Sequence, residues 1–154
     1  MMQKHASDKE QTLTFAGCRV LVVEDEYLLA QEIAHCLKEH GAQIVGPVPT
    51  VKKALRLIWA RDAINAAVLD IDLGGISAMA VARALRQREL PFVFATAFDP
   101  SVIPDEYRDI TCCQKPFDCK AIENSLLATL RRASSFEARR AVSRDDVRVC
   151  AVGL

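Results

Sequence analysis

Arg19-Val-Leu-Val-Val-Glu-Asp-Glu26 joins a short apolar run to three consecutive carboxylates. The run is rich in β-branched residues and shows no polar alternation, which is typical of a strand covered on both faces. From Tyr27 to His40 the apolar residues follow near-helical spacing, and Gly41 then stands at a helix-stop position. A buried strand followed directly by a helix predicts a βα unit.

The same alternation repeats along the chain. Further short apolar runs predict strands at 43–46, 66–71, 92–96 and 110–114. Apolar spacing and cap residues predict helices from Thr50 to about residue 61, over 78–88, and from Asp118 onward. Pro100 and Pro104 leave room only for a short or irregular helix over 99–109. Five successive βα units predict an α/β fold, with a doubly wound parallel sheet covered by helices on both faces.

Composition narrows the class of protein. The chain has 154 residues, about half of them apolar, and suits one compact domain. A formal net charge of zero argues against binding to nucleic acid or to an acidic membrane surface. No apolar run reaches the roughly 20 residues that span a bilayer, and the polar start is unlike a secretory signal. The six cysteines contain no CxxC pair, so we expect free thiols in a reduced, cytoplasmic protein.

The sequence predicts three regions. Residues 1–16 are expected to form a flexible N-terminal segment and residues 17–133 the folded domain. Residues 134–154 mix Ser, Arg and Asp with little periodicity, and predict either a loose tail or an extension of the last helix. The arginines of this last region are interspersed with acidic residues, which is more typical of a solvated face than of a partner site.

Chemically active side chains stand at the predicted strand ends. Ligands bind a doubly wound sheet outside the carboxyl ends of its strands. The residues found there are Glu24, Asp25, Asp70, Asp72, Thr96 and Lys115. Carboxylates about 4 Å apart repel by several kcal/mol even at an effective dielectric near 20, so such a cluster requires a cation. Oxygen-only ligands favour Mg²⁺ over zinc. With a lysine, a threonine and a nucleophilic carboxylate, the set predicts phosphorylation of Asp70.

The motifs that carry these residues resemble those of response-regulator receiver domains over roughly residues 18–133. They are Val20-Leu-Val-Val-Glu-Asp-Glu26, Val68-Leu-Asp70, Ala95-Thr96 and Lys115-Pro116-Phe117. The resemblance implies a flavodoxin-like fold, with strand order 2-1-3-4-5 and five flanking helices. It also implies that Asp70 is the phosphoacceptor, assisted by Thr96 and Lys115. The implied Mg²⁺ ligands are Glu24, Asp25, Asp70 and the backbone carbonyl of Asp72.

The same resemblance implies partners and an output. A sensor histidine kinase or a phosphotransfer protein would supply the phosphoryl group. The chain would then signal through protein contact, without a DNA-binding output domain, to an unknown downstream protein, and a homodimer is possible. A narrower resemblance is to the stand-alone receivers of the FAT GUY group, which often work with HWE-type kinases. It is carried by Leu69-Asp-Ile-Asp-Leu-Gly-Gly75 and Pro91-Phe-Val-Phe-Ala-Thr-Ala-Phe98.

Four positions depart from the family pattern, namely Ala97, Phe98, Cys112 and Asp72, and two of them bear on the response to phosphate. Ala97 replaces the glycine of the FAT GUY motif and removes easy access to positive φ. Cys112 stands where receivers carry a switch aromatic, three residues before the lysine. A rotamer swap of a buried aromatic is therefore not expected. We expect instead that residues 97–107 are mobile without phosphate and become ordered when phosphoryl oxygens bind.

Other functions remain open on sequence alone. Asp70-Ile-Asp72 also resembles the nucleophile and acid pair of haloacid-dehalogenase-type phosphatases, although that pair normally follows the first core strand rather than the third. A pseudo-receiver that binds partners without phosphorylation is a third interpretation. Glu24-Asp25-Glu26 taken alone fits an acidic helix start, and Lys115 taken alone fits a solvated surface lysine. Their joint occurrence at strand ends favours one functional site.

Overall fold

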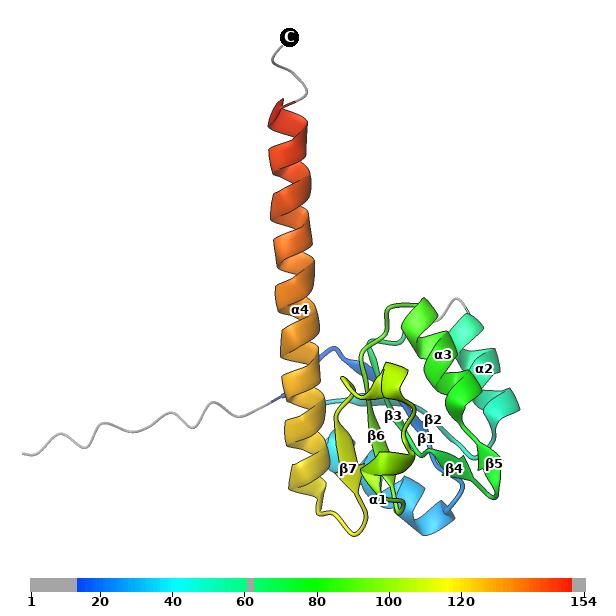
Figure 1. Cartoon of the computed structure of the whole chain (residues 1–154). Coiled ribbons are helices and arrows are strands. Elements are labelled where there is room, and N and C mark those ends of the chain that lie inside the picture. Colours follow the sequence, from blue (N-terminus) through cyan, green and yellow to red (C-terminus); the bar gives the residue numbers. More distant parts are fainter. Residues whose placement is uncertain (1–13, 61–62, 151–154) are drawn as a thin grey trace, which may run out of the picture.

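The computed structural model describes residues 14–60 and 63–150, with side chains described as far as residue 142. Its centre is a five-stranded parallel sheet in the order β2-β1-β3-β6-β7 (Figure 1). The strands are β1 (Arg19–Val23), β2 (Gln43–Val48), β3 (Ala66–Leu69), β6 (Phe92–Thr96) and β7 (Cys112–Gln114). This is the predicted order 2-1-3-4-5, because a separate small hairpin takes the labels β4 and β5.

Helices cover both faces of the sheet (Figure 1). The described residues form four α-helices, and two 3₁₀ turns stand where the fifth of the expected flanking helices would lie. Helices α1 (Tyr27–Glu39) and α4 (Cys119–Cys150) pack together on one face, and α2 (Val51–Trp59) and α3 (Met79–Gln87) on the other. The predicted caps begin two of them. Thr50 Oγ1 accepts a hydrogen bond from the Lys53 N–H at 3.2 Å, and Asp118 Oδ1 accepts one from the Ala121 N–H at 2.8 Å.

The connection between β6 and β7 contains two short 3₁₀ turns, η1 (Pro100–Val102) and η2 (Asp105–Tyr107). The prediction of a short or irregular helix there is confirmed. Pro100 begins η1, where a helix does not need its N–H, whereas Pro104 would leave a longer helix without an internal hydrogen bond. Ile103 and Tyr107 are buried in the core. We therefore confine the expected mobile stretch to residues 97–102.

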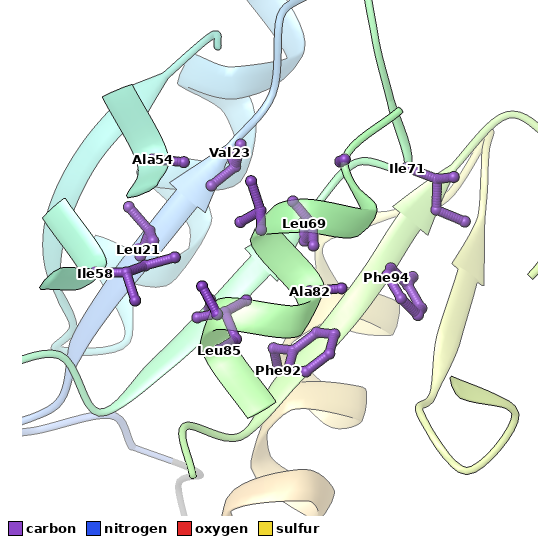
Figure 2. Packing of buried hydrophobic residues seen from close by; sticks show 14 of the residues in the cluster. Leu21, Val23, Ala54, Ile58, Leu69, Ile71, Ala82, Leu85, Phe92 and Phe94 are labelled. Atoms are coloured by element: carbon purple, nitrogen blue, oxygen red, sulfur yellow. The ribbon is translucent and has the colours of Figure 1, made fainter. Parts of the chain in front are cut away.

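Alternate strand residues contribute to two hydrophobic cores, one on each face of the sheet. Figure 2 shows the core under α2 and α3, where strand residues Leu21, Val23, Leu69, Phe92 and Phe94 meet Ala54, Ile58, Ala82 and Leu85. The intervening strand residues pack against α1 and α4; they include Val20, Val22, Val68, Val93 and Ala95. The three central strands, β1, β3 and β6, are thus apolar on both sides, as parallel strands between helices require.

The N-terminal boundary lies earlier than predicted. Phe15 is buried in the core beneath α1 and α4, and its N–H donates a hydrogen bond to the His40 carbonyl at 2.7 Å. This phenylalanine belongs to the packed domain rather than to a flexible segment. Residues 1–13 of the predicted segment lie outside the described residues.

Helix α4 has 32 residues and is about 48 Å long at 1.5 Å per residue. It continues as helix through residues 134–150, and this later part extends away from the sheet (Figure 1). Within residues 14–60 and 63–150, no helix combines the length and hydropathy needed to cross a bilayer.

Two cysteines that are far apart in the sequence meet between α1 and α4. Cys36 and Cys119 form a disulfide, with their Cα atoms 5.8 Å apart. The expectation of free thiols is wrong for this pair, because 83 residues separate the two cysteines and no local spacing indicates their contact. Cys18, Cys112 and Cys113 are free.

Candidate functional site

Five predicted site residues gather at the carboxyl ends of neighbouring strands. Glu24 and Asp25 follow β1, Asp70 follows β3, Thr96 ends β6 and Lys115 follows β7. These strands are adjacent in the sheet, so their ends converge at one edge. An open cavity of about 400 Å³ lies there, lined by Glu24, Asp25, Glu26, Asp70, Asp72, Gly74, Ala97, Phe98 and Lys115.

Three carboxylates form the acidic part of this cavity. Glu24, Asp25 and Asp70 each offer an oxygen, and these atoms all lie within 4.8 Å of one another. Glu24 and Asp70 are buried, whereas Asp25 is exposed. Oxygen donors from carboxylates suit a hard divalent cation such as Mg²⁺. The exposed position of Asp25 leaves the cluster open to solvent on one side.

Lys115 is the basic partner of the two buried carboxylates. Its Nζ donates hydrogen bonds to Glu24 Oε2 and to Asp70 Oδ2, both at 2.9 Å. The Lys115 N–H also donates to the Thr96 carbonyl at 2.7 Å, which extends the contact between β6 and β7. Desolvation opposes the charge on this lysine, but the hydrogen bonds with Asp70 and Glu24 outweigh it and raise the pKa of the ammonium. Lys115 is therefore a cation at neutral pH.

The single ammonium does not offset all of the negative charge. Burial raises the pKa of the Glu24 carboxyl from 4.5 to about 7, and the nearby Asp70 charge acts in the same direction. Hydrogen bonds from the Glu26 N–H, at 3.0 Å, and from Lys115 limit the rise. Three carboxylates beside one lysine favour the entry of a further cation. The donor set and its charge thus fit the metal that the sequence predicts.

Asp72 lies in a hairpin that is not among the predicted elements. Strands β4 (Asp72–Leu73) and β5 (Ile76–Ser77) are joined by Gly74 and Gly75, whose φ angles are +66° and +86°. Two successive positive φ angles are typical of a two-residue hairpin turn. Asp72 Oδ1 accepts a hydrogen bond from the Gly75 N–H at 2.9 Å, so this carboxylate stabilises the turn. The Asp72 N–H donates to Asp70 Oδ1 at 3.2 Å and orients it.

Thr96 lies at the end of β6 and is fully buried. Its Oγ1 accepts a hydrogen bond from the Phe98 N–H at 3.1 Å. Ala97 and Phe98 line the cavity, although Thr96 itself does not. Glu26 and Gly74 also line the cavity, and neither was predicted as a site residue. For Gly74 the sequence offered a signal, because the Gly-Gly pair after Asp72 is typical of a hairpin turn.

The family model for the response regulator receiver domain matches residues 20–126. This span covers more than half of the chain and includes each residue of the candidate site. The chain therefore belongs to the response regulator receiver domains of two-component signalling systems.

Individual relatives agree with this assignment. The sensory transduction protein LytT of Bacillus subtilis is 30% identical over 112 residues, covering 70% of this chain and 46% of LytT. The two-component response regulator PhoP of Pseudomonas aeruginosa is 32% identical over 128 residues, covering 77% of this chain and 54% of PhoP. The chain thus spans about half the length of these two curated relatives.

One solved structure is matched over almost its entire length. SdrG from Sphingomonas melonis Fr1 is 38% identical, with a TM-score of 0.64, and the match covers 77% of this chain and 97% of SdrG. The predicted flavodoxin-like receiver fold is confirmed by such neighbours and by the strand order.

Proposed function

We propose that this chain is a phosphorylatable signalling switch in which Asp70 accepts a phosphoryl group from a sensor histidine kinase or a phosphotransfer protein. One observation carries the proposal. The buried Asp70 carboxylate lines an acidic cavity, 2.9 Å from the Lys115 ammonium and beside the Glu24 and Asp25 carboxylates. A nucleophile, a cation and a cluster of metal-ligating oxygens are the components that phosphoryl transfer requires.

The chain's own residues have separate roles in this reaction. An Asp70 carboxylate oxygen attacks phosphorus, the P–N bond of a phosphohistidine donor breaks, and the imidazole leaves. Lys115 balances the charge that collects on the phosphoryl oxygens once the group is on Asp70. Thr96 donates its hydroxyl hydrogen to one of those oxygens, which requires that it turn from its present position. The Asp72 N–H keeps the Asp70 carboxylate oriented for the attack.

The residues that would hold Mg²⁺ are Glu24, Asp25, Asp70 and the backbone carbonyl of Asp72. When bound, the ion neutralises phosphoryl oxygens and aligns the group with Asp70. The mutual proximity of the three carboxylates supports this ligand set, as does the excess of negative charge over Lys115.

Several wider features belong to the same proposal. The folded receiver unit comprises residues 17–133 together with Phe15, which packs in its core. The protein works in the cytoplasm. It does not bind nucleic acid, and its output is contact with a downstream protein or with a second copy of itself. The Phe94-Ala-Thr-Ala-Phe98 motif supports a relation to the FAT GUY receivers, and hence to an HWE-type kinase.

The competing phosphatase interpretation depends on Asp72 as a general acid. Here the Asp72 carboxylate accepts a hydrogen bond from the Gly75 N–H within the β4–β5 turn. Because the Asp72 carboxylate is already held within this turn, the contact supports the receiver interpretation over the phosphatase interpretation. Sustained turnover of p-nitrophenyl phosphate, lost in Asp72→Asn, would favour the phosphatase.

Intact-mass measurement tests the main proposal. The full chain is incubated with acetyl phosphate and Mg²⁺, and we expect a gain of one phosphoryl group. Asp70→Asn should abolish the gain, while Asp105→Asn, an exposed aspartate paired with Arg108, should leave it unchanged. Retention of the phosphoryl group by Asp70→Asn would refute the assignment of Asp70.

A further inference from the structure

A cysteine pair connects the two helices on one face of the sheet. Cys36 lies in α1 and Cys119 is the first residue of α4, and their Cα atoms are 5.8 Å apart. This separation falls within the range that a disulfide requires. Cys18, Cys112 and Cys113 are free. The disulfide thus lies at the contact between α1 and α4.

The two thiols differ in their access to solvent. Cys36 is 4% exposed, whereas Cys119 is half-buried at the start of its helix. An oxidant can therefore reach Cys119 first, and Cys36 is positioned to react second. Sensor cysteines commonly have this arrangement, with an accessible thiol next to a resolving one.

The cross-link lies close to the candidate phosphorylation site along the chain. Lys115 is the first residue of the short connection from β7 to α4, and Cys119 is the residue at which α4 begins. At its first end this connection is fixed by the hydrogen bond from the Lys115 N–H to the Thr96 carbonyl. At its second end the disulfide fixes Cys119 to α1. The segment 115–118 is thus anchored on both sides while the bond exists.

A second contact, one turn further along, joins α4 to the residue that directly follows α1. His40 and Glu123 follow Cys36 and Cys119 by four residues, and His40 Nδ1 lies 2.8 Å from Glu123 Oε1. This contact does not depend on the redox state of the sulfurs. Reduction would therefore leave α1 and α4 packed while freeing the first turn of α4.

We propose that Cys36 and Cys119 form a reversible redox site, whose disulfide restrains segment 115–118 and keeps Lys115 against Asp70 and Glu24. The oxidant class is a peroxide. It converts the Cys119 thiol to a sulfenic acid and releases water, and the Cys36 sulfur then displaces a second water as the S–S bond forms. Two electrons pass to the peroxide, and both thiol hydrogens leave in water. A small-molecule or protein dithiol reverses the reaction.

The position of the pair favours regulation over simple reinforcement. In a cytoplasmic protein, disulfides are usually transient and serve redox sensing or catalysis. This part of the inference rests on the proposed function, because a restraint on Lys115 matters only if Asp70 is phosphorylated. The formation of the bond and its effect on segment 115–118 do not rest on it.

The first experiment concerns the bond itself. The full chain is reduced, treated with hydrogen peroxide and examined by intact mass and by digestion without reductant. We expect the loss of two hydrogen atoms, with one cross-linked peptide pair containing Cys36 and Cys119. Cys36→Ala and Cys119→Ser should each abolish the cross-link, and Cys112→Ser should retain it. Disulfides between other cysteines or between two chains would overturn the proposal, as would a zinc ion retained by the reduced chain.

The second experiment measures the restraint. Amide hydrogen exchange is compared between the oxidised and reduced wild-type chain, so that no substitution affects folding. Exchange over residues 115–121 should be several-fold slower in the oxidised form, and Cys36→Ala should show no such difference. Equal exchange in both forms would overturn the proposal. Neither readout requires phosphorylation, so a failure of Asp70 to accept phosphate would leave this inference standing.

Discussion

Replacing Lys115 by methionine removes a cation that contacts two buried carboxylates. In the structure the Lys115 ammonium lies 2.9 Å from both Glu24 and Asp70, whose side chains are 1% and 6% exposed. Loss of one partner from a buried ion pair typically costs about 3–5 kcal/mol, because the remaining charge is uncompensated. Lys115 itself is 16% exposed, so water offsets part of this cost. We expect the free energy of unfolding to fall by about 3 kcal/mol, the lower end of that range.

Urea unfolding of the full chain, followed by circular dichroism without metal, measures this loss. At an m-value of about 2 kcal/mol/M, a loss of about 3 kcal/mol lowers the midpoint by about 1.5 M. The matched control is Arg108→Met. Arg108 lies 2.7 Å from Asp105, but these side chains are 69% and 87% exposed. An exposed pair contributes about 0–1 kcal/mol, so the control should change the midpoint little.

The pH dependence of the variant makes the test sharper. The pKa of Glu24 is already raised to about 7 in the folded state, and loss of Lys115 removes a group that lowers it. A carboxyl with a raised folded-state pKa stabilises the fold below its unfolded pKa, and this contribution is lost as pH rises through the folded pKa. The Lys115→Met deficit should therefore be larger at about pH 8 than at about pH 5.5, and Mg²⁺ should reduce it. A deficit no larger than that of Arg108→Met, or one independent of pH, would refute this reasoning.

Three further predictions concern the metal and the segment after Thr96. Asp25→Asn should weaken Mg²⁺ binding in a calorimetric titration without destabilising the metal-free chain, because it removes both a ligand and a source of repulsion; an unchanged affinity would contradict the ligand set. Mg²⁺ affinity should fall as pH drops below about 7, because Glu24 takes up a proton there. Titrations in buffers of different ionisation enthalpy should detect proton release on binding, and an affinity that does not change across this pH range would count against Glu24 as a ligand. Hydrogen exchange should slow over residues 97–102 when a phosphoryl mimic binds, and less over 103–107, where Ile103 and Tyr107 are already buried; protection of 97–102 before the mimic is added would argue against a disorder-to-order switch.

The elements could be predicted because buried parallel strands leave a direct trace in the sequence. Arg19–Val23 and Phe92–Thr96 were predicted with their observed bounds, since each apolar run ends at a polar or small residue where the strand also ends. The third strand was predicted over 66–71 but ends at Leu69. Ile71 is buried outside the sheet pairing. An apolar run indicates which residues are buried, but burial continues beyond the last hydrogen bond between the strands. The end of the third strand therefore could not be predicted from the end of its apolar run.

The candidate site was more predictable than the packing around it. Each of its main side chains is fixed by its position at a strand end, so the sheet order alone brings Glu24, Asp70 and Lys115 together. Contacts between helices have no such rule. The Cys36–Cys119 and His40–Glu123 pairs depend on the register between α1 and α4, which apolar periodicity leaves undefined. Periodicity identifies the buried face of each helix, but not which residues of two faces meet.

The structure also bears on how a chain without the usual switch aromatic can respond at Thr96. Tyr107 is buried edge-on against Phe94, with ring centroids 6.2 Å apart, so neither ring is free to follow the threonine. Cys112 packs at the border of the same core and is too small to replace an aromatic ring. Phe98 remains, 46% exposed, and its N–H donates to the Thr96 hydroxyl. Under the proposed function, a turn of Thr96 toward a phosphoryl oxygen would break that hydrogen bond and release the Phe98 amide beside the cavity that Phe98 lines. A single hydrogen bond, from a backbone N–H to the threonine side chain, thus couples Thr96 to the segment that follows it, and this coupling requires no aromatic residue at position 112.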